Sequence, residues 1–174
     1  MLALQWRPKC FAPPTGNHSH QMTSPRSGQP DRLSADPADL FIYGSLLFPE
    51  VMRTLLGRVP DSTSAAAAGW RVAALAGRVY PALVPAEAVA TGRLVTGFTP
   101  KEWRLIDAFE DDVYELRRLT LSDGRYGWAY ICASGPGAPG GDWDIDAFER
   151  DHLTSYLKRC AAWRQRYEAQ VNER

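Results

Sequence analysis

The pattern of hydrophobic and polar positions divides the chain into two parts near residue 38. Residues 1–37 hold six of the thirteen prolines together with Gly, Ser, Asn and Gln, and their apolar residues follow no helical or strand period. Such a segment buries too little apolar surface to offset the entropy that it would lose on ordering. We therefore expect a flexible, proline-rich leader over residues 1–37 and a compact domain over residues 38–174.

Short apolar runs and a helical stripe open the compact part. The apolar run at residues 40–43 ends at Gly44, which predicts a buried strand that enters a tight turn. Pro49 precedes an apolar stripe and Gly57 ends it, so a helix is predicted between them. Further strands are predicted over residues 70–75, 79–84 and 89–95, with Pro85 as a boundary.

The second half of the compact part continues this mixture. Thr99, Pro100 and Glu102 form a capping-box pattern that predicts the start of a helix. Residues 114–121 and 126–132 flank a Ser-Asp-Gly-Arg turn, which predicts a hairpin. Because strands and helices do not alternate regularly, the pattern predicts an α+β fold with a small curved sheet or barrel.

A last helix is predicted to begin near Asp144 or Asp146. One side of it carries an apolar and aromatic stripe, made of Leu153, Tyr156, Leu157, Cys160, Trp163 and Tyr167. A stripe with the helical period is typical of core packing, and this interpretation is favoured over a cofactor-binding box.

Composition and charge narrow the class of protein. The chain of 174 residues has 20 Lys and Arg against 20 Asp and Glu, and this zero net charge argues against binding to a nucleic-acid backbone. No apolar run approaches the ~20 residues that span a bilayer, and the first ten residues do not resemble a signal peptide. Cys10, Cys132 and Cys160 are far apart and suggest neither a disulfide framework nor a zinc site. We expect a cytoplasmic protein with reduced thiols and no membrane partner.

Two features could carry chemistry, and the first is the turn Tyr43-Gly44-Ser45-Leu46. It lies between the first predicted strand and a helix. Glycine allows close approach to the main chain, and backbone amides in such a turn are suited to binding an anion or an oxyanion. The alternative interpretation is a tight turn that needs glycine for purely structural reasons.

The second feature is a group of four carboxylates at the end of the helix that starts near Thr99, namely Asp107, Glu110, Asp111 and Asp112. The helix dipole disfavours negative charge there, and neighbouring like charges raise a carboxyl pKa further. A carboxylate tuned in this way is suited to proton transfer near neutral pH. The alternative interpretation is a solvated acidic turn without a chemical role. A divalent metal site is a third one, although the spacing matches no calcium loop.

Other familiar chemistries lack their motifs. Ser45 is not in a GxSxG sequence, and His152 is the only histidine outside the leader, which argues against a Ser-His-Asp triad. Neither GxGxxG nor a phosphate-binding GxxxxGK[ST] sequence occurs. The sequence therefore shows no motif of a nucleophilic triad, of a dinucleotide-binding site or of a phosphate-binding loop.

Four segments in a fixed order carry a family resemblance, namely FIYGSLLFPEVMRTLLGRVP, GRVYPALVP, LIDAFEDDVYELRRLTL and GDWDIDAFERDHL. Together they resemble the gamma-glutamylcyclotransferase-like superfamily, and most of all its plant avirulence-induced-gene-like branch. The resemblance covers residues 40 to 167 and leaves out the leader. It implies a small mixed β-barrel flanked by helices, with a cavity between the YGSL loop and the FE motif.

The resemblance also implies roles for individual residues. Glu110 becomes the candidate general acid/base. Tyr43, Gly44, Ser45 and Leu46, with Leu47 as an extension, become a loop that cradles the substrate. Tyr130, in the last predicted strand, becomes a residue that lines the pocket, and Tyr114, which follows the FE motif, becomes one that helps to close the site.

The implied reaction is the release of 5-oxoproline from a small-molecule gamma-glutamyl amide, with no metal or cofactor. The rival hypotheses are a non-catalytic binding module on the same fold and an interaction protein, for which the cavity between Tyr43 and Glu110 should be blocked. The leaving group and the oligomeric state are left open by the sequence.

Overall fold

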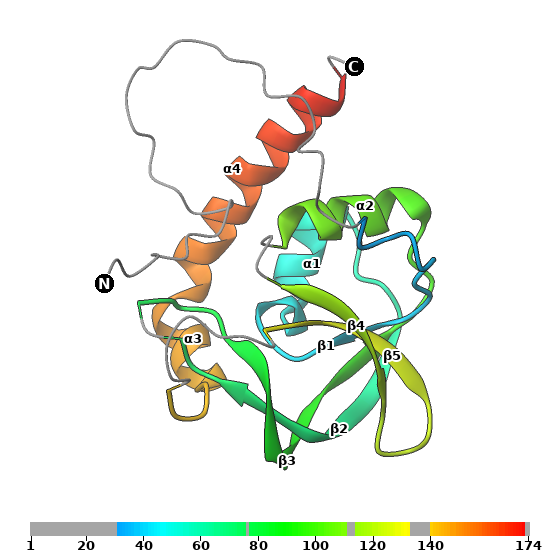
Figure 1. Cartoon of the computed structure of the whole chain (residues 1–174). Helices are drawn as coiled ribbons and strands as arrows, with labels where there is room; N and C mark the ends of the chain where they lie inside the picture. The colour runs from blue at the N-terminus through cyan, green and yellow to red at the C-terminus, as the bar shows by residue number, and fades with distance from the viewer. Residues whose placement is uncertain (1–30, 76, 111–113, 133–139, 173–174) are drawn as a thin grey trace, which may run out of the picture.

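The sheet is built around a short buried strand, β1 (Leu40–Ile42). This strand pairs antiparallel with β3 (Ala82–Val95) and parallel with β5 (Tyr126–Ile131). The outer strands β2 (Ser62–Ala73) and β4 (Glu115–Thr120) pair antiparallel with β3 and β5, so the order is β2-β3-β1-β5-β4 (Figure 1). Strand β1 is therefore the middle strand and is buried along its length, and the segment that follows it leaves the sheet from its middle.

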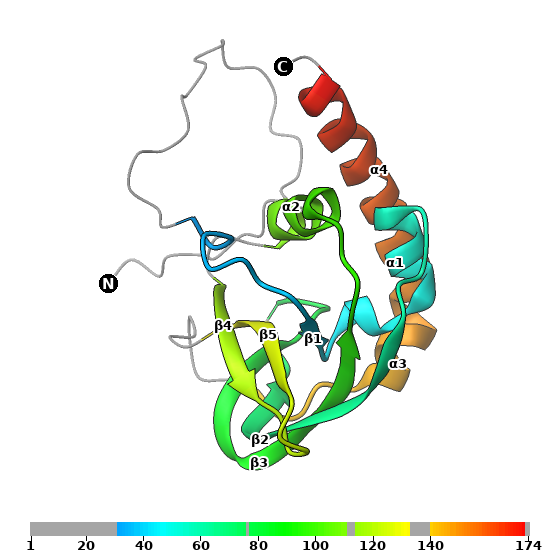
Figure 2. The ribbon, with the colours of Figure 1, turned by 90° about the vertical axis from the view of Figure 1, so that its right-hand side faces the viewer.

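This architecture comes from a computed structural model that describes residues 31–75, 77–110, 114–132 and 140–172. It confirms the predicted α+β class, with one difference in the sheet. The five strands curl strongly, so that the Ser122 N–H donates to the Ala66 carbonyl at 2.8 Å, from the β4–β5 turn to β2. Strands β2 and β4 still form two separate edges, and the expected barrel is an open, curled sheet (Figure 2).

The long β2–β3 hairpin corrects the predicted strand boundaries. Residues 79–84 and 89–95 were expected as two strands separated at Pro85, but β3 runs through Pro85 without a break. The register shifts opposite Gly69, which has a φ of +84°, so a bulge lies beside the proline. A bulge tolerates a residue that lacks an N–H group, and the proline therefore does not end the strand. The alanine-rich start of β2 was missed because alanine favours strands weakly.

The helix signals in the first part of the domain are confirmed. Helix α1 (Pro49–Leu56) begins at its proline and ends at Gly57 in the left-handed conformation. Helix α2 (Pro100–Phe109) has the complete capping box. The Glu102 N–H donates to Thr99 Oγ1 at 3.2 Å, and the Thr99 N–H donates to Glu102 Oε2 at 2.8 Å.

The segment that was predicted to form one last helix forms two helices. Asp144 caps the first, α3 (Ile145–Asp151), by accepting from the Ala147 N–H, and the chain bends at His152 before α4 (Leu153–Asn172). The predicted stripe on α4 is confirmed as packing, with Tyr156 and Cys160 buried. Helix α4 packs against α1 along one side of the molecule (Figures 1 and 2).

An aromatic cluster fixes the bend between α3 and α4. Phe148 is 1% exposed and its ring centroid lies 5.2–5.3 Å from those of Phe48, Trp143 and Tyr156. Each such pair contributes roughly 0.5–1.5 kcal/mol beyond the burial of its area. The cluster therefore determines where the first turns of α4 lie relative to α1.

Residues 1–30 of the predicted leader, with Cys10, lie outside the described residues. In the described part of that segment, Pro37 is buried and Leu33 packs against the core. The boundary at residue 37 stays a prediction. No helix in the described ranges is long and apolar enough to cross a membrane.

Candidate functional site

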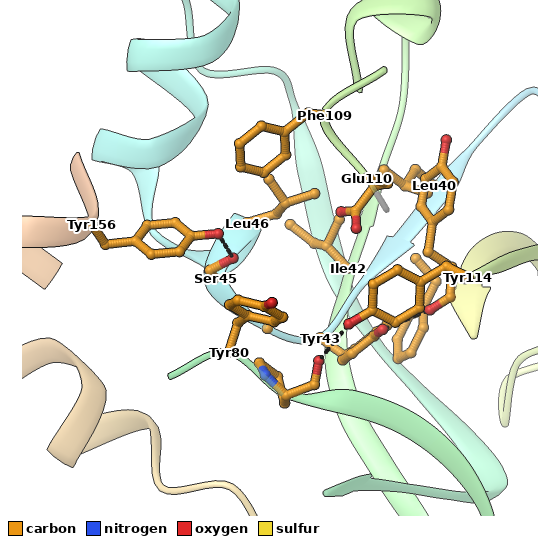
Figure 3. A pocket seen from close by; sticks show the side chains of 14 residues that line it. Leu40, Ile42, Tyr43, Ser45, Leu46, Tyr80, Phe109, Glu110, Tyr114 and Tyr156 are labelled. Carbon is orange, nitrogen blue, oxygen red and sulfur yellow. Dashed lines mark hydrogen bonds between the residues drawn. The ribbon is translucent and has the colours of Figure 1, made fainter. Parts of the chain in front are cut away.

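A pocket lies where β1 leaves the sheet and α2 ends (Figure 3). Its volume is about 60 Å³, several times the ~10–15 Å³ that a single water needs. The pocket lies between Tyr43 and Glu110. The hypothesis of an interaction protein expected a blocked cavity at this place. Of the predicted site residues, the structure places seven in its wall: Tyr43, Gly44, Ser45, Leu46, Glu110, Tyr114 and Tyr130. Leu47 is not in the wall and packs against the core.

The YGSL loop forms one wall because the chain turns sharply after β1. Gly44 precedes a single 3-10 turn, η2 (Ser45–Leu47), in which the Leu47 N–H donates to the Gly44 carbonyl at 2.9 Å. The first amides of such a turn have no acceptor within it. A Cβ atom on Gly44 would lie 2.8 Å from Pro81 Cγ. Glycine is thus required here by the packing of Pro81, a structural reason that the sequence did not reveal.

A hydroxyl pair joins this loop to α4. Ser45 Oγ and the Tyr156 hydroxyl lie 2.9 Å apart, and both residues line the pocket. Tyr156 was predicted only as a packing residue. The pocket wall therefore includes a side chain that the sequence places 111 residues away from the loop.

Glu110 occupies the opposite wall. It is the C-cap of α2, with φ −72° and ψ 140°, and its N–H donates to the Ile106 carbonyl at 2.9 Å. The change from helical to extended backbone directs its side chain away from the helix. Figure 3 shows the carboxylate pointing toward the space between Ser45, Tyr80 and Tyr114. Among the described residues of the pocket wall, Glu110 is the only one with a charged side chain.

Two tyrosines of the pocket wall, Tyr43 and Tyr114, each donate a hydrogen bond from the hydroxyl group to a backbone carbonyl. The Tyr43 hydroxyl donates to the Tyr130 carbonyl at 2.6 Å, and the Tyr114 hydroxyl donates to the Pro81 carbonyl at 3.1 Å. Burial, and then the charge of Glu110, raises the pKa of Tyr43 far above its ordinary value. Burial also raises the pKa of Tyr114. Both phenols therefore stay protonated at neutral pH and cannot act as bases there.

Asp107, the first carboxylate of the acidic cluster, does not line the pocket. It forms an ion pair with Arg32, Nε to Oδ1 at 2.9 Å, and accepts from the Tyr130 hydroxyl at 2.9 Å. Burial, and then the charge of Asp107, raises the pKa of Tyr130. Asp111 and Asp112 lie outside the described residues. Within the described ranges no three His, Cys, Asp or Glu side chains gather as metal ligands.

The sequence indicated no role in the site for several residues that shape it. Tyr80 and Pro81 line the pocket, and their signal was the YPA segment of the family resemblance. Phe109 and Tyr156 also line it, although their apolar stripes indicated packing alone. Arg32 lies in the predicted leader, where nothing in the pattern distinguished it.

A family model described as "Gamma-glutamyl cyclotransferase, AIG2-like" matches residues 40–145. Among curated proteins, AIG2-like protein D of Arabidopsis thaliana is 33% identical over 130 residues, which are 68% of this chain and 84% of that protein. AIG2-like protein C of the same plant is 45% identical over 84 residues, 48% of this chain and 49% of that protein.

A solved structure agrees with these matches. The solution structure of an Arabidopsis thaliana protein with 28% sequence identity superposes with a TM-score of 0.54 and covers 72% of this chain and 89% of that one. A second Arabidopsis solution structure, 24% identical, has the same TM-score and supports the fold alone; it covers 78% of this chain and 84% of that one.

Proposed function

Because the chain belongs to the gamma-glutamyl cyclotransferase, AIG2-like, family, we propose that it releases 5-oxoproline from a gamma-glutamyl amide, with Glu110 as the general acid/base. The second product is a free amine or amino acid. One observation carries this proposal, namely that the Glu110 carboxylate faces the YGSL loop across a single pocket. A carboxylate in that position can accept a proton from a bound ammonium group.

The reaction requires that the substrate is held in an attack geometry and that protons move from its α-nitrogen to the departing nitrogen. Glu110 accepts a proton from the substrate's α-ammonium group, and the amine nitrogen then forms a bond to the γ-carbonyl carbon. The tetrahedral intermediate re-forms its C=O bond and breaks the original amide C–N bond. Two protons leave the α-nitrogen in all, and Glu110 passes each one to the departing nitrogen. Both reacting groups belong to one molecule, so folding the substrate into an attack geometry supplies much of the acceleration.

The other pocket residues supply hydrogen bonds. The amides at the start of η2 are suited to binding the α-carboxylate or the developing oxyanion. Tyr43 and Tyr114 remain neutral at physiological pH because burial raises the pKa of each phenol. Neither phenol therefore competes with Glu110 for the role of base.

The test is 5-oxoproline release, measured by mass spectrometry, from a panel of gamma-glutamyl amino acids and gamma-glutamyl amines. Wild type and Glu110→Gln are compared, and we expect turnover to fall by about 10²–10⁴ in the variant. The matched control is Glu115→Gln, the same change on an exposed residue of β4 outside the pocket. It should turn over like wild type.

A melting-temperature assay separates catalysis from binding. Glu110→Gln should fold and should still be stabilised by a substrate that wild type converts. Equal turnover in wild type and Glu110→Gln would remove the carboxylate from the mechanism. Stabilisation of wild type by gamma-glutamyl compounds without any product would instead establish a binding module.

A further inference from the structure

The positive charge at the end of α2 comes from outside the helix. The last turn of α2 contains no basic residue, although Asp107 in that turn is acidic. Arg32 supplies the missing cation from the segment before β1, and its side chain is only 16% exposed. An arginine at a helix C-terminus stabilises the negative end of the helix dipole and the carbonyl groups that have no partner within the helix.

Four polar contacts join Arg32 to described residues at and just after the end of α2. Its Nη2 group donates to the Asp107 carbonyl at 2.7 Å and to the Glu110 carbonyl at 3.3 Å. Its Nη1 group donates to the Tyr114 carbonyl at 3.1 Å, and Nε lies 2.9 Å from Asp107 Oδ1. The planar guanidinium can serve several acceptors in fixed directions, which a lysine ammonium cannot do in the same way. One side chain thereby fixes the backbone of Glu110 and of Tyr114.

The same contacts reach Tyr130. Asp107 Oδ1 accepts from the Tyr130 hydroxyl at 2.9 Å as well as pairing with Arg32, and the Arg32 guanidinium carbon lies 5.3 Å from the centroid of the Tyr130 ring. Tyr130, Glu110 and Tyr114 line the pocket, whereas Arg32 does not. Among the described residues of the pocket wall, these three are the ones that Arg32 is seen to contact.

We propose that Arg32 is a positioning residue, which holds the end of α2 so that the Glu110 carboxylate faces the substrate. Its effect on turnover rests on the proposed function, whereas its effect on the Glu110 backbone does not. Since Arg32 does not line the pocket, its loss should lower kcat and leave KM nearly unchanged. Misplacement of a catalytic group by about 1 Å can cost about 10²-fold in rate, so a loss of about this size is expected.

The experiment compares Arg32→Ala with Arg58→Ala. Arg58 is a matched control because it also binds a carboxylate of α2 and a backbone carbonyl nearby, but at the start of the helix. Its Nε and Nη2 groups contact Glu102 at 2.6 and 2.8 Å, and Nη2 donates to the Gly97 carbonyl at 3.0 Å. We expect kcat to fall in Arg32→Ala alone. Added guanidinium ion should partly restore kcat in that variant, and an equal concentration of sodium should not.

A second readout needs no substrate. Hydrogen exchange of the Glu110 backbone amide, followed by NMR, should be faster in Arg32→Ala than in wild type and unchanged in Arg58→Ala. If Arg32→Ala does not fold, Arg32→Lys takes its place, with a smaller effect in the same direction. If wild type shows no turnover, the proposed function fails and the amide exchange alone decides on Arg32. Unchanged exchange, or a kcat within about twofold of wild type, would overturn the positioning role.

Discussion

The hydroxyl groups of Ser45 and Tyr156 lie 2.9 Å apart and join the pocket loop to α4. Ser45 opens the η2 turn, and Tyr156 lies near the start of α4, beside the aromatic cluster around Phe148. The loop that faces Glu110 is therefore attached to the part of the molecule that the bend at His152 positions.

This contact predicts that Tyr156→Phe, which keeps the ring and removes the hydroxyl, weakens folding by about 1 kcal/mol. Turnover should fall less than about tenfold, because the loop amides, not the hydroxyls, are expected to bind the substrate. Ser45→Ala should behave alike, and the double variant should cost less than the sum of the two single ones. Urea unfolding and 5-oxoproline release measure both effects. Complete loss of activity in Ser45→Ala alone would assign the Ser45 hydroxyl a chemical role.

Gly44→Ala should damage the pocket by steric contact with Pro81. The new Cβ atom would lie 2.8 Å from Pro81 Cγ, and overpacking of this kind costs roughly 1–3 kcal/mol. We expect lower stability together with a loss of turnover, since the clash displaces the loop itself. Adding Pro81→Ala removes the opposing ring and should recover most of both losses. A double variant as impaired as the sum of the single variants would show that the contact is not the cause.

The Glu102 side chain should make stability depend on acidic pH. The Arg58 guanidinium beside it lowers the pKa of Glu102 from 4.5 to about 2 in the folded protein. A lowered folded-state pKa stabilises the protein fully above pH 4.5, and this contribution disappears as pH falls from 4.5 toward 2. Glu102→Gln should therefore cost up to about 1 kcal/mol at pH 7, because Arg58 is half exposed, and less at pH 3. Urea unfolding at both pH values measures the difference, and an equal cost at the two values would contradict it.

The two described thiols should be inert in the folded protein. Cys132 and Cys160 are buried. Burial raises the pKa of Cys160 to about 12 and also raises that of Cys132, so the reactive thiolate is scarce at pH 8. In a Cys10→Ser variant, a chromogenic disulfide reagent should modify neither thiol until urea unfolds the chain. Rapid modification under native conditions would show that one of them is accessible.

Local signals in the sequence were enough to predict much of the fold. The capping box at Thr99, the terminal Gly57 and the hairpin turn before Tyr126 depend on neighbouring residues only, and the structure contains each of them. The predicted break at Pro85 was wrong because β3 stays paired with β2 on both sides of a bulge, in which residues 86–88 face Gly69. Whether a proline ends a strand depends on the partner strand, which the local pattern does not contain.

The residues of the candidate site also divide into those that local sequence motifs identify and those that only tertiary contacts identify. Glu110 and the YGSL loop have motifs that the resemblance identified, and the structure places them around one pocket. Tyr156 and Arg32 join the site through contacts that span 111 and 75 to 82 residues of sequence. An arginine in a proline-rich segment and a tyrosine in a packing stripe carry no local mark of such contacts. Only tertiary structure distinguishes them from their neighbours.

Because the chain bends at His152, helix α4 supplies one part of the pocket wall and can change without a change in the sheet. The family model matches residues 40–145, whereas the wall formed by Tyr156 belongs to α4. A change in the angle or side chains of α4 would alter the shape of the pocket next to the YGSL loop while the sheet and Glu110 stayed as they are. In this architecture Glu110 and the part of the pocket wall formed by Tyr156 lie on separate elements of the chain, so that one can change while the other is kept.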